Sequence, residues 1–161
     1  MKKIDLGATS AAGHMAVHVA PAYSRFQRIS NLENAMSLAS TLWDTAGWLW
    51  SDRHPGVDRS KHRSVAETFD KDLFSRCPDL GLIRDLAEVT KHGGELSRKT
   101  VTVTGLSGSG SPGGTLFVST PFGGMTEAKP ECTLQIEHDG KSRNMTDALA
   151  TAYKFLLAEA G

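Results

Sequence analysis

The hydrophobic pattern of this chain changes its period near Lys99, and this change limits the possible folds more than any other feature. Before Lys99, apolar residues recur every three to four positions, as they do on the buried face of a helix. After it, β-branched and apolar residues alternate with polar ones, which is typical of strands. The helical period returns after Asn144. The pattern therefore predicts a helical body, then strands, then a final helix.

Three helices are expected before the change. The first spans about 21–51, because Pro21 suits a first helical turn and an apolar stripe follows. That stripe consists of Leu32, Ala35, Met36, Ala39, Leu42, Trp43 and Ala46. The second covers about 58–76, with a capping box formed by Ser64 and Glu67. The third begins at Pro78 and ends before Gly93-Gly94, which is a typical C-terminal cap.

Strands are expected at 100–104, 115–120 and 133–138. Asp139-Gly140 favours a tight turn with a short returning segment, and Asn144 or Thr146 can cap the last helix. Together these elements predict an α+β fold: a three-helix N-terminal body, a small antiparallel β-meander, and a C-terminal helix packing back on the core. We expect one such domain over 22–161, preceded by a flexible N-terminus over 1–21.

Composition excludes some functional classes and favours a globular protein. Of the 161 residues, 39% are hydrophobic and 22% are charged, as in folded domains. Lysine plus arginine equals aspartate plus glutamate at 18 each, so no overall basic surface indicates nucleic-acid binding. No predominantly apolar stretch is long enough to span a membrane. Two cysteines without a CxxC pair, Cys77 and Cys132, favour a reducing compartment and a cytoplasmic location.

The first residues have two interpretations. Asp5, His14 and His18 interrupt the apolar run that a signal peptide would need. Gly13-His14-Met15 resembles the junction left by removal of an expression tag, in which case residues 1–14 carry no functional weight. A native, flexible N-terminus fits equally well.

Two motifs of cofactor and metal sites occur without their usual context. Gly108, Gly110 and Gly113 spell GxGxxG, but Pro112 interrupts the run and a strand follows where a dinucleotide site needs a helix. The segment 107–114 is therefore expected to be a flexible hairpin loop that binds no nucleotide. The six histidines form neither HExxH nor a histidine–cysteine set, which favours exposed histidines and no metal or other cofactor.

Trp43, Trp48 and Trp50 cluster near the end of the first expected helix. They could form an aromatic binding surface. Large aromatic side chains more often close a core, with the indole N–H bonded to one partner. We favour the core interpretation.

The third expected helix carries the strongest candidate for chemistry. Arg84 and His92 lie two turns apart, about 12 Å along the axis and about 80° around it. A guanidinium can stabilise phosphate charge and an imidazole can transfer a proton, so this pair could cleave a phosphodiester. Asp85 and Lys91 could support them. The simpler interpretation is a solvated face, with Glu88 forming i,i+4 pairs to both residues and Lys91 and His92 favouring the helix C-terminus.

These residues also carry a resemblance to a known family. Leu42-Trp43, Trp48 and Trp50, then Cys77-Pro78-Asp79-Leu80, then Arg84-Asp85-Leu86-Ala87 with Lys91-His92, resemble a group of small bacterial proteins and, more distantly, the HEPN superfamily of helical bundles. The resemblance covers about residues 22–94. HEPN ribonucleases have an arginine, often followed by a polar residue, four to six intervening residues before a histidine. Here seven residues separate Arg84 from His92, which departs from that motif.

The resemblance implies an RNA-binding or RNA-cleaving domain, such as a toxin or a defence component. It would use Arg84 and His92, and it would be a homodimer because HEPN nucleases bring two motifs together. The alternative is a non-catalytic domain that binds a protein or a small ligand through its helical face or its meander. Neither hypothesis includes a membrane partner.

Overall fold

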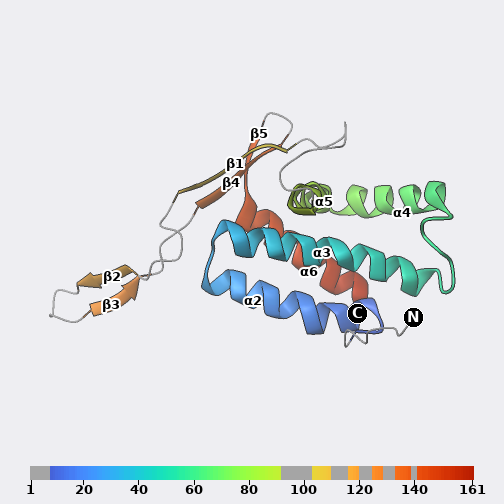
Figure 1. Cartoon of the computed structure of the whole chain (residues 1–161), viewed down its shortest axis with the longest axis horizontal. Coiled ribbons are helices and arrows are strands. Elements are labelled where there is room, and N and C mark those ends of the chain that lie inside the picture. Colours follow the sequence, from blue (N-terminus) through green and yellow to red (C-terminus); the bar gives the residue numbers. More distant parts are fainter. Residues whose placement is uncertain (1–7, 92–102, 110–115, 120–124, 129–132, 139–140) are drawn as a thin grey trace.

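A computed structural model describes residues 8–91, 103–109, 116–119, 125–128, 133–138 and 141–161 (Figure 1). The helical segments are α1 (Ala11–His14), the π-helical turn η1 (Met15–Val19), α2 (Ala20–Arg28), α3 (Leu32–Arg53), α4 (Arg63–Arg76), α5 (Pro78–Lys91) and α6 (Met145–Ala160). The strands are β1 (Val103–Ser109), β2 (Leu116–Ser119), β3 (Met125–Ala128), β4 (Thr133–His138) and β5 (Lys141–Asn144).

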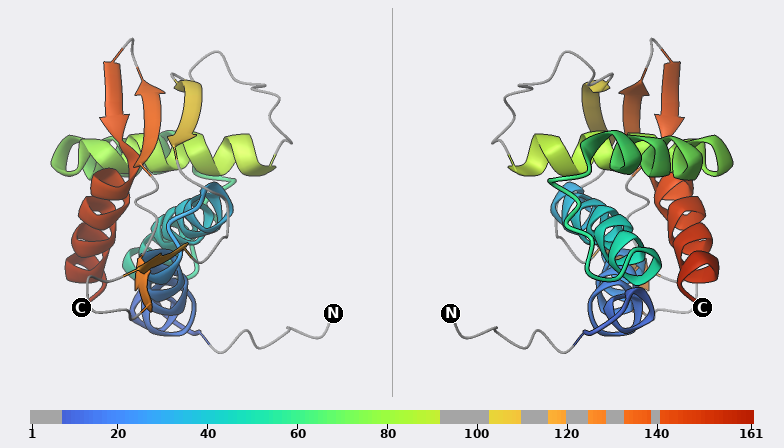
Figure 2. Two further views of the ribbon diagram at one scale, coloured as in Figure 1. Left: turned by 90° about the vertical axis from the view of Figure 1, so that its left-hand side faces the viewer. Right: turned by 90° about the vertical axis from the view of Figure 1, so that its right-hand side faces the viewer.

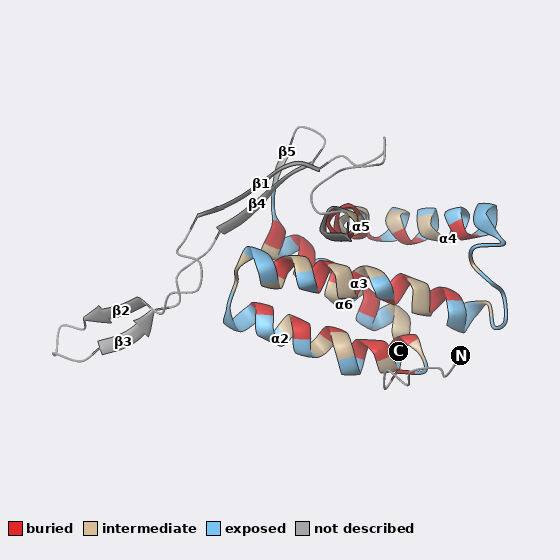
Figure 3. Ribbon diagram, viewed as in Figure 1, coloured by how far each residue is buried: buried red, intermediate tan, exposed pale blue. Residues whose placement is uncertain are grey.

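The protein is mostly helical, so the expected α+β class with a three-helix body and a β-meander is wrong. Where the structure describes side chains, every buried residue lies on a helix or at Ala8 or Cys77 (Figure 3). More than three helical segments precede the strands. Alternating sequence locates extended segments, but it does not determine whether they enter the core.

Local capping explains where the helices differ from the expected ones. The single helix expected over 21–51 is divided, because the Asn31 side chain accepts a hydrogen bond from the Asn34 N–H at 2.8 Å and starts α3 anew. Asn144 caps α6 in the same way, as predicted, by accepting from the Thr146 N–H at 2.8 Å. The predicted cap at Ser64 is wrong, since Ser64 lies inside α4.

Helix α3 lies at the centre of the bundle. It contacts α2, η1, α5 and α6, and the buried side chains of these elements form one cluster. From α3 the cluster includes Ala35, Leu38, Ala39, Leu42, Ala46 and Leu49. From α5 and α6 it includes Leu80, Leu82, Ile83, Leu86, Leu149, Ala152 and Leu156. The bundle therefore rests on one apolar core.

The N-terminal segment belongs to this core. Ala11, Met15 and Val19 are buried in the cluster, and the Ala11 N–H donates to the Asp52 carboxylate on α3 at 2.7 Å. Residues 11–21 are therefore helical, where a flexible segment was expected. Ala11, Met15 and Val19 recur every four residues, as on one helix face, but the resemblance of Gly13-His14-Met15 to a tag junction led us to expect no packed structure here.

The strands form two separate groups at the periphery. β1, β4 and β5 form an antiparallel sheet in the order β1-β4-β5, while β2 and β3 form a hairpin of their own. The three-stranded sheet lies beside α5 and leads directly into α6 (Figure 2). The hairpin loop expected over 107–114 is wrong for residues 107–109, which belong to β1 and pair with β4. Residues 110–114 lie outside the described residues.

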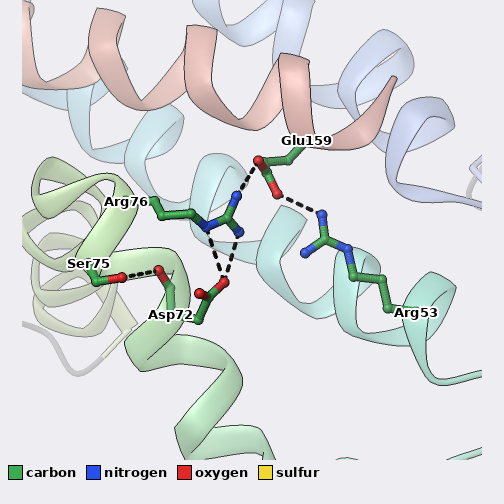
Figure 4. A network of polar contacts seen from close by, with 5 residues as sticks. All are labelled: Arg53, Asp72, Ser75, Arg76 and Glu159. Atoms are coloured by element: carbon green, nitrogen blue, oxygen red, sulfur yellow. Dashed lines mark hydrogen bonds and ion pairs between the residues drawn. The ribbon is translucent and has the colours of Figure 1, made fainter.

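A network of charges holds the C-terminal end of α6 (Figure 4). Glu159 accepts hydrogen bonds from Arg76 of α4 and Arg53 of α3, each at 2.6 Å, and Arg76 also pairs with Asp72 at 3.0 Å. A carboxylate in the last turn of a helix opposes the helix dipole. The two arginines offset this cost, and they hold the pKa of Glu159 below its usual range, mainly through the hydrogen bond from Arg76.

We predict that Met15→Ala destabilises the protein by about 2–3 kcal/mol, because it leaves a cavity in the core. Val17→Ala is the matched control, since Val17 lies on the same turn with 46% of its surface exposed. It should change stability by less than about 0.5 kcal/mol. Urea unfolding measures both variants. Equal midpoints for Met15→Ala and the wild type would show that the N-terminal segment does not stabilise the bundle.

We predict that Glu159→Gln costs about 1 kcal/mol near neutral pH. Because the pKa of Glu159 is lowered in the folded state, its contribution is present above the unfolded-state pKa and is lost as pH falls through the folded pKa. The variant should therefore approach the wild type in stability as pH falls below the usual pKa of a glutamate and through the lowered folded-state pKa. Thermal unfolding across this range, with Glu33→Gln on α3 as a control, tests the network. A deficit that does not depend on pH would contradict it.

Candidate functional site

Arg84 and Asp85 form an ion pair on α5. Arg84 donates to Oδ1 of Asp85 from Nε at 3.0 Å and from Nη2 at 2.8 Å. The Asp85 side chain is only 3% exposed and that of Arg84 is 29% exposed. A buried carboxylate needs a charged or hydrogen-bonding partner, so Asp85 orients the guanidinium. The structure thus brings together two of the four residues predicted for this site.

The other two predicted residues remain untested. Lys91 is the last residue of α5, and His92 lies outside the described residues. The expected convergence of Arg84 and His92 therefore stays a prediction.

An aromatic ring further restricts the position of Arg84. Its guanidinium carbon lies 4.9 Å from the centre of the Phe74 ring, and Phe74 stacks on Trp43 at 5.9 Å. The Phe74 ring lies against the guanidinium, while Asp85 accepts hydrogen bonds from Nε and Nη2 of the same group. Arg84 is therefore held in place at the surface by one aromatic ring and one carboxylate.

These residues line a groove between α3, α4, α5 and the 58–60 loop, which we call the α4 groove. Its volume is about 1240 Å³. Its charged lining residues are Arg59, Arg63, Lys71, Arg84, Asp44, Asp58, Glu67, Asp70 and Glu88. Four are cationic and five are anionic, so the lining has both signs and no excess of positive charge.

One wall of the α4 groove is fixed by Arg59 and Asp70. Nη2 of Arg59 lies 2.5 and 2.6 Å from the two Asp70 oxygens, and Nη1 donates to the Ala46 carbonyl at 3.4 Å. Burial raises the pKa of Asp70, and Arg59 opposes that effect. The pair fastens the loop after α3 to α4.

The tryptophans divide between the two proposed roles. Trp50 is fully buried, and its indole N–H donates to the Val57 carbonyl at 3.2 Å, as the core interpretation predicted. Trp43 and Trp48 are half-buried, and each lines a surface hollow as well as packing on the core. The sequence did not distinguish the buried tryptophan from the two half-buried ones, because all three lie within eight residues on one helix.

A second hollow lies on the other side of α3, between that helix and the N-terminal segment. We call it the histidine hollow; its volume is about 500 Å³. Its lining residues are His14, His18, Thr41, Asp44, Gly47, Trp48 and Ser51. Asp44 and Gly47 also line the α4 groove, so the two depressions adjoin across α3.

His14 is buried, where an exposed histidine was expected. Its Nε2 lies 3.1 Å from the Thr41 carbonyl, and its ring stacks on Trp48 at 5.8 Å and lies 5.1 Å from the His18 ring. Burial lowers the pKa of His14, with a smaller lowering by His18. The signal for this hollow was the i,i+4 spacing of the two histidines, which sequence reasoning set aside with the N-terminus.

Among the described residues, no group of three histidine, cysteine, aspartate or glutamate side chains could hold a metal ion. None of the described helices is long and apolar enough to span a membrane. Comparison with known proteins finds no matching family model, no matching curated protein and no matching solved structure.

Gly47 keeps the surface between the two hollows open. A Cβ at this position would meet nothing within 4 Å, although glycine weakens a helix interior by about 1 kcal/mol relative to alanine. No tight packing in the described structure requires glycine here. The described packing around Gly47 would therefore accept a Cβ.

We predict that Gly47→Ala stabilises the protein by about 0.5–1 kcal/mol. Gly56→Ala is the contrasting control: its site is equally open, but its φ of 76° disfavours alanine. That variant should lose about 1 kcal/mol. Chemical denaturation measures both. A loss of stability in Gly47→Ala would mean that the glycine is needed for folding.

Proposed function

We propose that this protein is a non-catalytic interaction domain that binds a polypeptide segment in the α4 groove. The observation that carries the proposal is Arg84, held over Phe74 by Asp85 in a groove of mixed charge. Arginine and tryptophan are enriched among the residues that contribute most to protein binding. Arg84 and the half-buried Trp43 both line the α4 groove, so the groove contains both of these residue types.

The charge of the lining supports a polypeptide over a nucleic acid. A phosphodiester backbone carries one sign of charge, and its binding depends on clustered lysine and arginine. Carboxylates line the α4 groove alongside its cations, and Arg59 and Arg63 are paired with Asp70 and Glu67. A polypeptide can present both signs. The carboxylates of such a polypeptide would bind Arg84 in the planar, bidentate geometry that a guanidinium favours.

A HEPN-like RNA-binding or RNA-cleaving domain is the second candidate. Two observations favour it: Arg84 and Asp85 lie together on a helix of a mostly helical protein, and Arg84 is partly exposed. Such a function would use His92 as the proton-transfer group and would need a second copy of the chain to complete the site. The acidic lining of the α4 groove weighs against it.

We predict that peptides selected from a random displayed library will bind the wild type in the α4 groove. Arg84→Lys should weaken this binding by about tenfold or more, because lysine keeps a charge for Asp85 but loses the planar fork. Arg28→Lys, on the exposed face of α2, should leave it unchanged. Titration calorimetry measures affinity, and amide chemical shifts should change for α3, α4 and α5.

Two outcomes would overturn the proposal. In the first, selected peptides perturb only residues outside the α4 groove, or bind Arg84→Lys as well as the wild type. In the second, the purified protein cleaves RNA, and both Arg84→Lys and His92→Ala abolish cleavage while folding normally. That second result would establish the nuclease function instead.

A further inference from the structure

We propose that residues 11–19, which we call the N-terminal arm, respond to acid: protonation of His14 loosens the arm from α3 while the rest of the bundle stays folded. The arm consists of α1 and η1 and continues into α2. It packs on both α3 and α6. The inference does not rest on the function proposed for the α4 groove, because His14 does not line that groove.

His14 lies in the contact between the arm and α3. Only 6% of its surface is exposed, and its ring stacks on Trp48. The Thr41 carbonyl can only accept, so Nε2 of His14 donates their 3.1 Å hydrogen bond. A second proton would go to Nδ1, and no described side chain or carbonyl accepts a hydrogen bond from that atom. A buried charge with an unpaired N–H is costly, so the packed arm favours a neutral His14.

The charges around His14 do not remove this cost. Burial lowers the pKa of His14, His18 on the same arm lowers it further, and Asp44 on α3 opposes both effects without reversing them. Asp44 already has a partner. On α3, the Asp52 carboxylate accepts the first N–H of α1, and on α6 the Glu159 carboxylate is paired with two arginines. A protonated His14 is therefore disfavoured where it is buried.

The π-helical turn provides a hinge at which the arm can separate from α2. π-helical turns interrupt the regular hydrogen bonding of a helix and often mark bends. On one side of η1, α2 is anchored by the buried Phe26 and by Tyr23, which stacks on Tyr153 of α6 at 4.1 Å. On the other side, α1 has only four residues. Short terminal helices belong to the parts of a fold that open most easily, so the arm can open without unfolding α2.

The direction of the pH effect follows from the two states of His14. In the open arm His14 is exposed and takes its ordinary pKa of about 6.5, whereas in the packed arm its pKa is lowered. The open state binds more protons between these two pKa values. The packed arm is therefore fully stable above about pH 6.5 and loses stability as pH falls from there to the lowered pKa. Over that interval the opening constant rises by up to about tenfold per pH unit.

Amide hydrogen exchange of the whole protein between about pH 8 and pH 5, corrected for the intrinsic effect of pH on exchange, tests the proposal. Protection of residues 11–19 should fall by up to about tenfold per pH unit below about pH 6.5, while α5 keeps its protection. In a proton NMR titration, the His14 ring should titrate at lower pH than the exposed His62. His14→Gln, whose amide can still donate to the Thr41 carbonyl, should abolish the pH dependence, and His62→Gln should retain it.

Three results would overturn the proposal. The first is protection of the N-terminal arm that does not change with pH in the wild type. The second is an equal loss of protection in the arm and in α5, which would show unfolding of the whole bundle. The third is a folded His14→Gln variant with the same pH dependence as the wild type. If that variant does not fold, the ring titration decides: a His14 pKa at or above that of His62 contradicts the proposal, and a lower one supports it.

Discussion

The packing of α3 against its neighbours is the interaction on which the rest of the structure depends. Its apolar face is buried by α2, η1, α5 and α6, and Trp50 closes the end of this core near the Val57 carbonyl. Burying large side chains on one helix stabilises several elements together. The opposite face of α3 is only partly covered, and both surface hollows adjoin there.

Charged residues act differently at the edges of this bundle than in its two hollows. At the C-terminal end, Arg53 and Arg76 compensate a carboxylate that the helix dipole disfavours, which joins three helices. On α5, the buried Asp85 uses Arg84 as its partner and so fixes a guanidinium at the surface. An ion pair that satisfies a buried carboxylate thus also restricts the position of a partly exposed guanidinium.

The candidate site was predictable from the sequence only in part. The third helix and its Arg84 were recognised because the apolar spacing and the charged residues are local features. The ion-pair partner of Arg84 was not recognised, because a pair with Glu88 was expected and the observed hydrogen bonds go to Asp85. The histidine hollow was missed because His14 meets Thr41 and Trp48 only after the N-terminal segment packs on α3.

The sequence by itself located the helical stretches that became α3, α4, α5 and α6 through their apolar periodicity, and the Asn144 cap was recognised from its own neighbours. Tertiary structure alone decided the class of the fold, because alternating segments become peripheral strands or core strands according to what covers them. It also decided that Met15 is core while Trp48 lines a hollow. Helix formation depends on residues a few positions apart, whereas burial depends on which distant segment packs against each side chain.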